Sequence, residues 1–157
     1  MHKMNGWNES RSLCLSRVMV WVFFAALIAC DIFGWWLVRF LCERLIAVNH
    51  GLAGGYILLG CLYACSIPAY VVLWDLHRLL KHIGGGQIFV SENVRALRRI
   101  SWCCIAAALI TAAAAVIEWP SLALITVAAG FMALIVRIVK NVFERAIAMK
   151  DELDLTI

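Results

Sequence analysis

One acidic side chain, Asp31, lies deep inside an apolar run, and it is the residue whose type and position most favour chemistry. A charged group within a membrane span is costly, so such residues usually face other helices and mark a function. Its candidate partners are Arg39, Tyr63, Ser66 and Thr111. Two interpretations stay open, a proton or ion pathway and a hydrogen-bonded Asp that holds helices together. The chain has no second acid at comparable depth, which favours the second interpretation.

The cysteine and histidine residues form no recognisable metal site. Cys61 and Cys65 are four residues apart on one helical face, but a metal would need further ligands at the same depth. His77 and His82 diverge around a helix, and the run Gly84–Gly86 lacks the Gly-Lys-Ser/Thr ending of a phosphate loop. We therefore predict thiols that act as small apolar packing groups, with no metal, no cofactor and no enzymatic activity.

The composition indicates that lipid surrounds the elements that carry these residues. Hydrophobic residues make up 64% of the 157 residues, whereas a soluble domain is nearer half apolar. A helix crosses a bilayer with about 20 apolar residues. We predict an all-α fold, an integral membrane four-helix bundle formed by a single domain over residues 1–157. Its four expected spans are residues 18–38, 53–74, 100–117 and 122–136.

Local signals place helix boundaries and irregularities. Pro68 should kink the second span, and Ser66 is available to satisfy the freed backbone groups. The glycine run should end this helix, and Ser91 is a good N-cap for the next one. We expect the second, third and fourth helices to extend into the cytosol, with a cytosolic hairpin over residues 75–99 and a C-terminal helix and tail over residues 137–157.

The positions of the basic residues orient the chain. Only Arg39 and Arg44 fall on the outer side if both termini are cytoplasmic. This bias matches the positive-inside rule and predicts a multi-pass protein of the bacterial inner membrane. The cytosolic basic residues are Lys3, Arg11, Arg17, Arg78, Lys81, Arg95, Arg98, Arg99, Arg137, Lys140, Arg145 and Lys150.

Three of these residues, Arg95, Arg98 and Arg99, cover one face of the helix that follows Ser91. Basic side chains at this position suit anionic lipid head groups, so we predict that they face lipid. Direct nucleic-acid binding is a poor fit, because the membrane competes for the same face.

Membrane topology does not explain the apolar residues in the cytosolic turn and tail. The tail from Glu152 alternates polar and apolar residues, which is a strand-like pattern. Such a tail can add a strand to a partner or dock on its own hairpin, and both alternatives stay open. The candidate interaction residues are Phe89, Val90, Ser91, Asn93, Val94, Leu153, Asp154, Leu155, Thr156 and Ile157.

The same two segments resemble a known family. Residues 86–100 contain a glycine turn, a Phe and an Asn-Val pair before a basic helix, and residues 152–157 read Glu-x-Asp-Leu-Thr-Ile. With the four-span layout, these motifs resemble DUF2975, a family of small bacterial membrane proteins of unknown function. The resemblance implies no established activity. It does imply a membrane-bound regulator, because family members look to be encoded beside a small helix-turn-helix DNA-binding protein.

Three functional hypotheses follow. The first is a regulatory or interaction protein that acts through its cytosolic hairpin and tail on a soluble partner, with a helix-turn-helix regulator implied by the resemblance. The second is a small transporter, channel or membrane-redox component that uses Asp31. The third is an accessory subunit of a membrane complex. Expected partners are the lipid bilayer and a soluble protein or a second copy of the chain.

Overall fold

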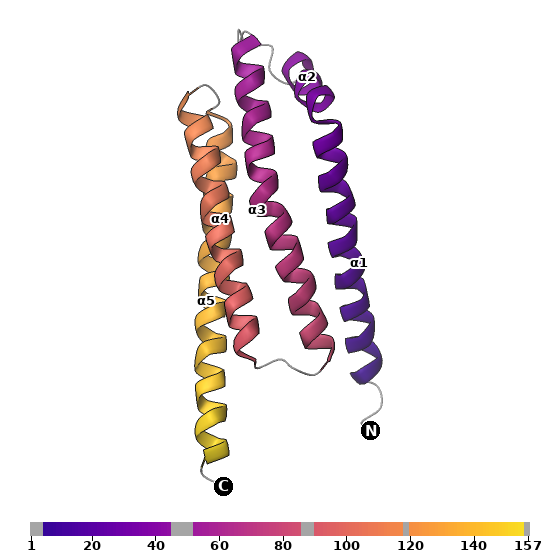
Figure 1. Ribbon diagram of the computed structural model, residues 1–157, viewed down its shortest axis with the longest axis vertical. Coiled ribbons are helices and arrows are strands. Elements are labelled where there is room, and N and C mark those ends of the chain that lie inside the picture. The colour runs from indigo at the N-terminus through magenta and orange to yellow at the C-terminus, as the bar shows by residue number, and fades with distance from the viewer. Residues whose placement is uncertain (1–4, 45–51, 86–89, 118–119, 156–157) are drawn as a thin grey trace.

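The computed structural model describes the backbone of residues 5–44, 52–85, 90–117 and 120–155, with the side chains of most of them. Within these residues every regular element is an α-helix, so the all-α prediction is confirmed. Four helical stretches of the described chain are long and apolar enough to cross a bilayer. The helices are α1 (Asn5–Ile32), α2 (Gly34–Arg44), α3 (Leu52–Gly84), α4 (Ser91–Ile117) and α5 (Leu122–Leu155) (Figure 1).

The helices stand in a row instead of closing into a bundle. α5 packs on α4, α4 on α3, and α3 on α1 and α2 (Figure 1). In the described part of the chain, α1 makes no close backbone approach to α4 or α5, and α3 makes none to α5. The bundle arrangement predicted from the sequence is therefore wrong. In lipid, apolar faces gain little by turning toward one another, so packing between successive neighbours is enough to hold the row.

The first predicted span, residues 18–38, is interrupted at Phe33, where α1 ends and α2 begins. Gly34 is buried directly after the break. A Cβ at this position would lie 3.0 Å from Cδ2 of Leu62 on α3, so a larger residue would require this side chain to shift. The apolar run continues through the break, which is why hydropathy alone predicts one unbroken span.

α3 runs as one helix through Pro68 and bends near its middle (Figure 1). A proline inside a helix removes one backbone hydrogen bond and favours such a bend. Ser66 does not compensate in the way the sequence predicts. Its hydroxyl oxygen lies 3.1 Å from the carbonyl of Leu62 and closer to a side chain of α1, so its single proton is shared between these acceptors.

α4 and α5 form the closest pair of the row. Ser101 donates a hydrogen bond to the carbonyl of Ala133 at 3.2 Å, and Thr126 donates to the hydroxyl of Thr111 at 2.9 Å. Ala133 is 5% exposed. Small residues of this kind let membrane helices approach until polar side chains reach across. The alanine-rich sequence of α4 thus makes it the helix on which α3 and α5 pack.

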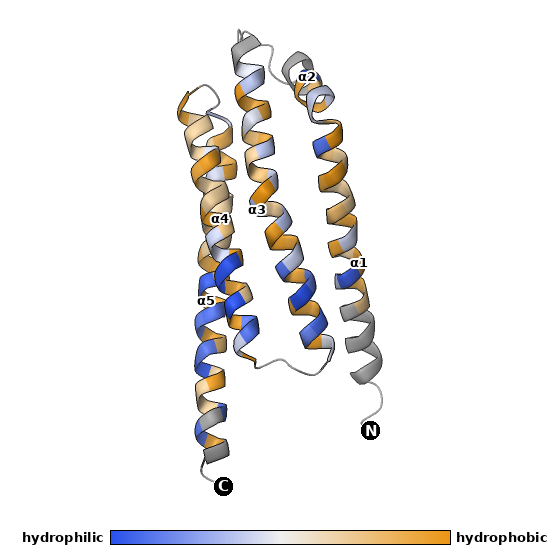
Figure 2. Cartoon of the chain, viewed as in Figure 1, coloured by the Kyte–Doolittle hydropathy of each residue, from blue (hydrophilic) through white to orange (hydrophobic). Residues whose placement is uncertain are grey.

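Polar residues gather at one end of the row. α3 ends, α4 begins and α5 ends there, and α1 begins there too (Figure 1). Hydrophilic residues concentrate in the lower turns of α3, α4 and α5, whereas the opposite half is mainly apolar (Figure 2). We call this end the basic end, because it carries Arg78, Arg95, Arg98, Arg99 and Lys140.

The predicted strand-like tail is wrong over residues 151–155, which continue α5 as a helix. The reason is that Ile138, Val142, Met149 and Leu153 recur at helical spacing, so the alternation in the last residues only overlays a longer helical pattern. Helices also propagate more easily than they nucleate, which favours continuing α5 over a new element. Residues 156–157 lie outside the described chain.

Candidate functional site

Two groups of polar side chains stand out, and the first surrounds Asp31 on α1. Ser66 donates a hydrogen bond to Oδ1 of Asp31 at 2.5 Å, and Tyr70 donates to Oδ2 at 2.8 Å. Both carboxyl oxygens are thus engaged by hydroxyl groups of α3. The hydroxyl of Tyr63 donates to the backbone carbonyl of Asp31 at 3.0 Å. In an unbroken helix this carbonyl would accept the N–H four residues later, so Tyr63 supports the break after α1.

Aromatic rings extend this contact between α1 and α3. Phe24 meets Tyr70 edge to face with ring centroids 5.5 Å apart, and Trp21 meets His77 in the same way at 5.8 Å. Such pairs add to the stability given by burial. Asp31 therefore lies in a line of specific contacts that fix α1 against α3.

The predicted partners of Asp31 were only partly right. Tyr63 and Ser66 are in place, whereas Thr111 pairs with Thr126 at the α4–α5 interface. Arg39 lies on α2 beyond the break, with its side chain exposed. Tyr70 was missed, although it falls on the same helical face as the other two donors, seven residues after Tyr63 and four after Ser66.

In the described part of the chain the thiols make no hydrogen bond to Asp31, and they lie mainly around a separate cavity. Four of them line an apolar cavity of about 450 Å³ between α1, α3 and α4. Among the described residues no group of three or more His, Cys, Asp or Glu side chains is placed to hold a metal ion. The four cysteines are Cys30, Cys65, Cys103 and Cys104.

The second polar group lies at the basic end and joins α3 to α4. Asp75 on α3 is 2% exposed, and its Oδ1 accepts a hydrogen bond from Arg99 on α4 at 2.7 Å. Its other oxygen, Oδ2, is buried without a hydrogen-bond partner. A buried carboxylate is tolerated when a cation neutralises it, so Arg99 is needed for Asp75 to lie here.

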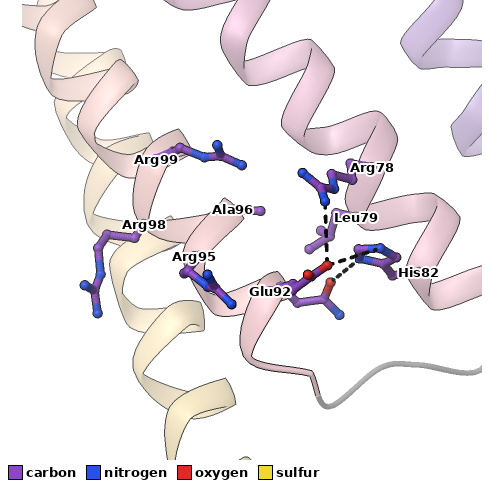
Figure 3. A pocket seen from close by; sticks show the side chains of 9 residues that line it. Arg78, Leu79, His82, Glu92, Arg95, Ala96, Arg98 and Arg99 are labelled. Atoms are coloured by element: carbon purple, nitrogen blue, oxygen red, sulfur yellow. Dashed lines mark hydrogen bonds and ion pairs between the residues drawn. The ribbon is translucent and has the colours of Figure 1, made fainter.

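Asn93, near the start of α4, makes a further contact between the two helices, and its side chain is fully buried. Its Oδ1 lies 3.1 Å from Nδ1 of His82 at the end of α3. Nε2 of His82 lies 3.6 Å from Glu92, and Arg78 reaches the same carboxylate at 3.7 Å (Figure 3). These contacts hold the end of α3 against the start of α4 with polar pairs from both helices.

Two of the arginines that we predicted to face lipid also contact acids on neighbouring helices. Arg99 pairs with Asp75, and Arg98 turns toward α5, where it pairs with Glu144 at 3.3 Å. An acid on the neighbouring helix offers each guanidinium a fixed partner, which lipid alone does not. Arg95 is exposed and contacts no acidic group among the described residues. The side chains of Arg98 and Arg99 also stay more than half exposed, so lipid-facing placement remains a prediction for all three arginines.

A cavity of about 300 Å³ opens between these groups. Arg78 and His82 line it from α3, and Glu92, Arg95 and Arg99 line it from α4 (Figure 3). Seven of the nine lining residues have polar side chains, and four of these are arginines. It is the one described cavity in which arginines from two helices face each other.

The predicted interaction residues divide into buried and outward-facing groups. Asn93 and Val94 are buried, so they hold the hairpin together and present no surface to a partner. Ser91 and Leu153 are exposed, and Val90 is half-buried. The remaining residues lie outside the described residues or have side chains that are not described, namely Phe89, Asp154, Leu155, Thr156 and Ile157.

The family model described as "Protein of unknown function (DUF2975)" matches residues 17–157, which are nearly the whole chain and include the basic end. The chain belongs to the DUF2975 family. The resemblance drawn from the turn and tail motifs is therefore confirmed. In this DUF2975 protein, both residues of the Asn-Val pair are buried, and Asn93 contacts His82 of α3.

A relative supports the membrane assignment. The uncharacterized membrane protein YoaS of Bacillus subtilis (strain 168) is 28% identical to the chain over 108 residues, which cover 61% of this chain and 68% of the relative. No solved structure matches the chain. The chain is accordingly a multi-pass membrane protein with a bacterial relative.

Proposed function

We propose that this DUF2975 protein is a non-enzymatic regulatory protein of the bacterial inner membrane that docks a soluble partner on the end of α5. In this proposal both termini and the α3–α4 turn are cytoplasmic, because the basic end concentrates the arginine and lysine residues that the positive-inside rule assigns to the cytoplasm. The apolar half of the row then spans the bilayer (Figure 2).

The observation that carries the proposal is the length of α5. The contacts of Ser101 with Ala133 and of Thr111 with Thr126 fix an antiparallel register between α4 and α5. In this register the first residue of α4 lies opposite the region of Arg145. About ten residues of α5, or roughly 15 Å of helix, then run past the start of α4 (Figure 1).

This overhang carries an apolar face. Met149 is 60% exposed and Leu153 is 66% exposed, and they continue the face of Ile138 and Val142. An amphipathic helix with apolar residues at such spacings is the element that a groove on a partner protein recognises. A cytoplasmic helix that contacts only water needs no exposed apolar face. We therefore propose that a soluble protein with an apolar groove binds the face of Met149 and Leu153. A helix-turn-helix regulator is the partner class that the family resemblance favours.

The test compares two double variants of the full chain. Met149→Gln with Leu153→Gln removes the apolar face, whereas Ala148→Gln with Lys150→Gln places two glutamines on exposed neighbouring positions. Proteins that co-purify in mild detergent are identified by mass spectrometry, and the strongest candidate is purified and rebound to each variant.

We expect one soluble protein to bind the wild type and the control variant, and to bind the Met149 and Leu153 variant at least tenfold more weakly. Two apolar side chains that become buried in the complex account for a change of this size when they are lost. Equal recovery of the same proteins by both variants would refute the docking role of α5. Recovery of only a second copy of the chain would also contradict it.

A further inference from the structure

The cavity at the basic end combines features of an anion site that the docking proposal does not use. Its volume is about 300 Å³, and its lining includes four arginines: Arg78, Arg95, Arg98 and Arg99. From these residues, we infer that the cavity binds one phosphate group between α3 and α4. The phosphate belongs either to an anionic phospholipid or to a small soluble phosphorylated compound.

The charge balance of the lining is the first argument. Three of the four arginines contact an acid: Arg78 reaches Glu92, Arg98 reaches Glu144 and Arg99 reaches Asp75. Glu144 also accepts Lys140 at 3.2 Å, so it is shared between two cations. Arg95 has no acidic partner among the described residues. The lining therefore keeps an excess positive charge that an anion can neutralise.

The second argument is the availability of the side chains that would bind. Arg78 lies 3.7 Å from Glu92, which is a long ion pair, and 53% of its side chain is exposed. Arg78 and Arg95 come from opposite walls of the cavity (Figure 3). Two guanidinium groups can therefore approach one anion from two helices without breaking the contact of Arg99 with buried Asp75.

The third argument is the rigidity of the walls. The buried Asn93 side chain joins α4 to His82 of α3 directly beside the cavity. Arg99 and Asp75 join the same two helices on its other side. Both walls are thus held at a fixed separation before an anion arrives, which reduces the entropic cost of binding.

Phosphate fits this lining better than other anions do. The planar fork of a guanidinium donates two parallel hydrogen bonds to phosphate oxygens, and a tetrahedral phosphate can receive such forks from two directions. Basic pockets between membrane helices at the head-group level are a known setting for anionic lipid head groups. In the proposed orientation the cavity lies at that level, on the cytoplasmic side.

The experiment measures binding of two probes to the full chain in detergent by native mass spectrometry. One probe is phosphatidylglycerol, with zwitterionic phosphatidylcholine as the comparison of zero net charge, and the other is inorganic pyrophosphate. Arg95→Gln and Arg78→Gln are the test variants. Arg145→Gln is the matched control, because Arg145 is exposed on α5 and does not line the cavity.

We expect Arg95→Gln and Arg78→Gln each to weaken binding of the preferred probe about tenfold, the effect of one lost charge-assisted hydrogen bond. Arg145→Gln should stay within about twofold of the wild type, as expected for a screened surface charge. Selective binding of phosphatidylglycerol that pyrophosphate does not displace would identify a lipid site. Saturable pyrophosphate binding that displaces the lipid would identify a soluble phosphorylated ligand.

Two outcomes would overturn the inference. Equal weakening by Arg145→Gln and Arg95→Gln would show that general surface charge attracts the probes. Failure of the wild type to bind either probe would exclude a phosphate site. Arg95 makes no contact with an acid, so its replacement leaves the fold intact and keeps the test decisive. Neither outcome bears on docking at α5, which is tested with variants of Met149 and Leu153.

Discussion

Asp31 illustrates how a polar residue inside a membrane helix is made tolerable. Ser66 and Tyr70 each donate a hydroxyl hydrogen bond to its carboxyl group, so neither oxygen faces lipid without a partner. All these groups belong to α1 and α3, and the contact continues through the ring pair of Phe24 with Tyr70. This arrangement favours a role in joining helices over a role in moving ions.

Replacement of Asp31 tests this interpretation. Asp31→Ala removes both acceptors and should lower the free energy of unfolding in mixed micelles by about 1 to 2 kcal/mol, the upper range for hydrogen bonds between membrane helices. Asp31→Asn keeps one acceptor of similar shape and should lose about half as much.

Ion flux provides the contrasting measurement. We expect Asp31→Asn in liposomes to behave like the wild-type chain. A flux that the wild type shows and Asp31→Asn lacks, together with unchanged stability, would support the transport hypothesis and contradict the joining role.

Individual contacts were predictable from the sequence only where a spacing rule applied. Ser66 and Tyr63 were recognised as partners of Asp31, and Tyr70 completes the same helical face. The pairing of Asp75 with Arg99 depends on how α3 and α4 are placed relative to each other. No periodicity in the sequence encodes that geometry, so the pair is visible only in the folded chain.

At the scale of elements, α4 and α5 show how small residues organise the row. Ala133 is 5% exposed, and its carbonyl accepts a hydrogen bond from Ser101. Alanine at this point brings the two backbones close enough for a serine to reach across. The alanine-rich composition of α4 was apparent in the sequence, but the partner helix and register were not.

Matched substitutions on α5 test this packing. Ala133→Leu inserts a larger side chain between α4 and α5 and should destabilise the protein by about 1 to 3 kcal/mol, the usual cost of overpacking. Ala128→Leu makes the same chemical change at an exposed position of the same helix and should be nearly neutral. The free energy of unfolding in micelles measures both. Equal effects of the two variants would show that α4 and α5 are not closely packed at Ala133.

Helix boundaries show where sequence patterns misled. The break at Phe33 falls inside an unbroken apolar run, and the buried Gly34 was its only local signal. At the other end of the chain, alternation over a few residues predicted a strand, yet Met149 and Leu153 extend the helical face of α5. A short pattern with period two cannot compete with a helix already formed over many preceding residues.

At the scale of the whole molecule, hydropathy predicted the number of long membrane helices but not their arrangement. Each apolar helix satisfies its own backbone, so its existence follows from composition alone. Whether four such helices close into a bundle depends on contacts between distant faces. Among the described residues, close backbone contacts run from α1 to α3, from α3 to α4 and from α4 to α5, with α2 beside α1 and α3. The result is a row with one polar, cationic end (Figure 2).

Both proposals rest on placing this basic end in the cytoplasm. Docking on the α5 overhang requires a soluble partner there, and the arginine cavity is proposed to lie at the same surface. The positive-inside bias of the basic residues predicts this orientation. The two ends of the membrane-spanning helices lie on opposite sides of the bilayer. A reporter fused at each end therefore assigns the side of that end independently.

The most direct test is therefore a pair of reporter fusions made in bacteria. Green fluorescent protein, which fluoresces only in the cytoplasm, is fused after Ile157, and alkaline phosphatase, which is active only outside it, is fused after His50. We predict a fluorescent first fusion and an active second fusion, with the exchanged reporters silent at both sites. An active phosphatase after Ile157, or fluorescence after His50, would contradict the orientation and with it the proposed docking role of α5.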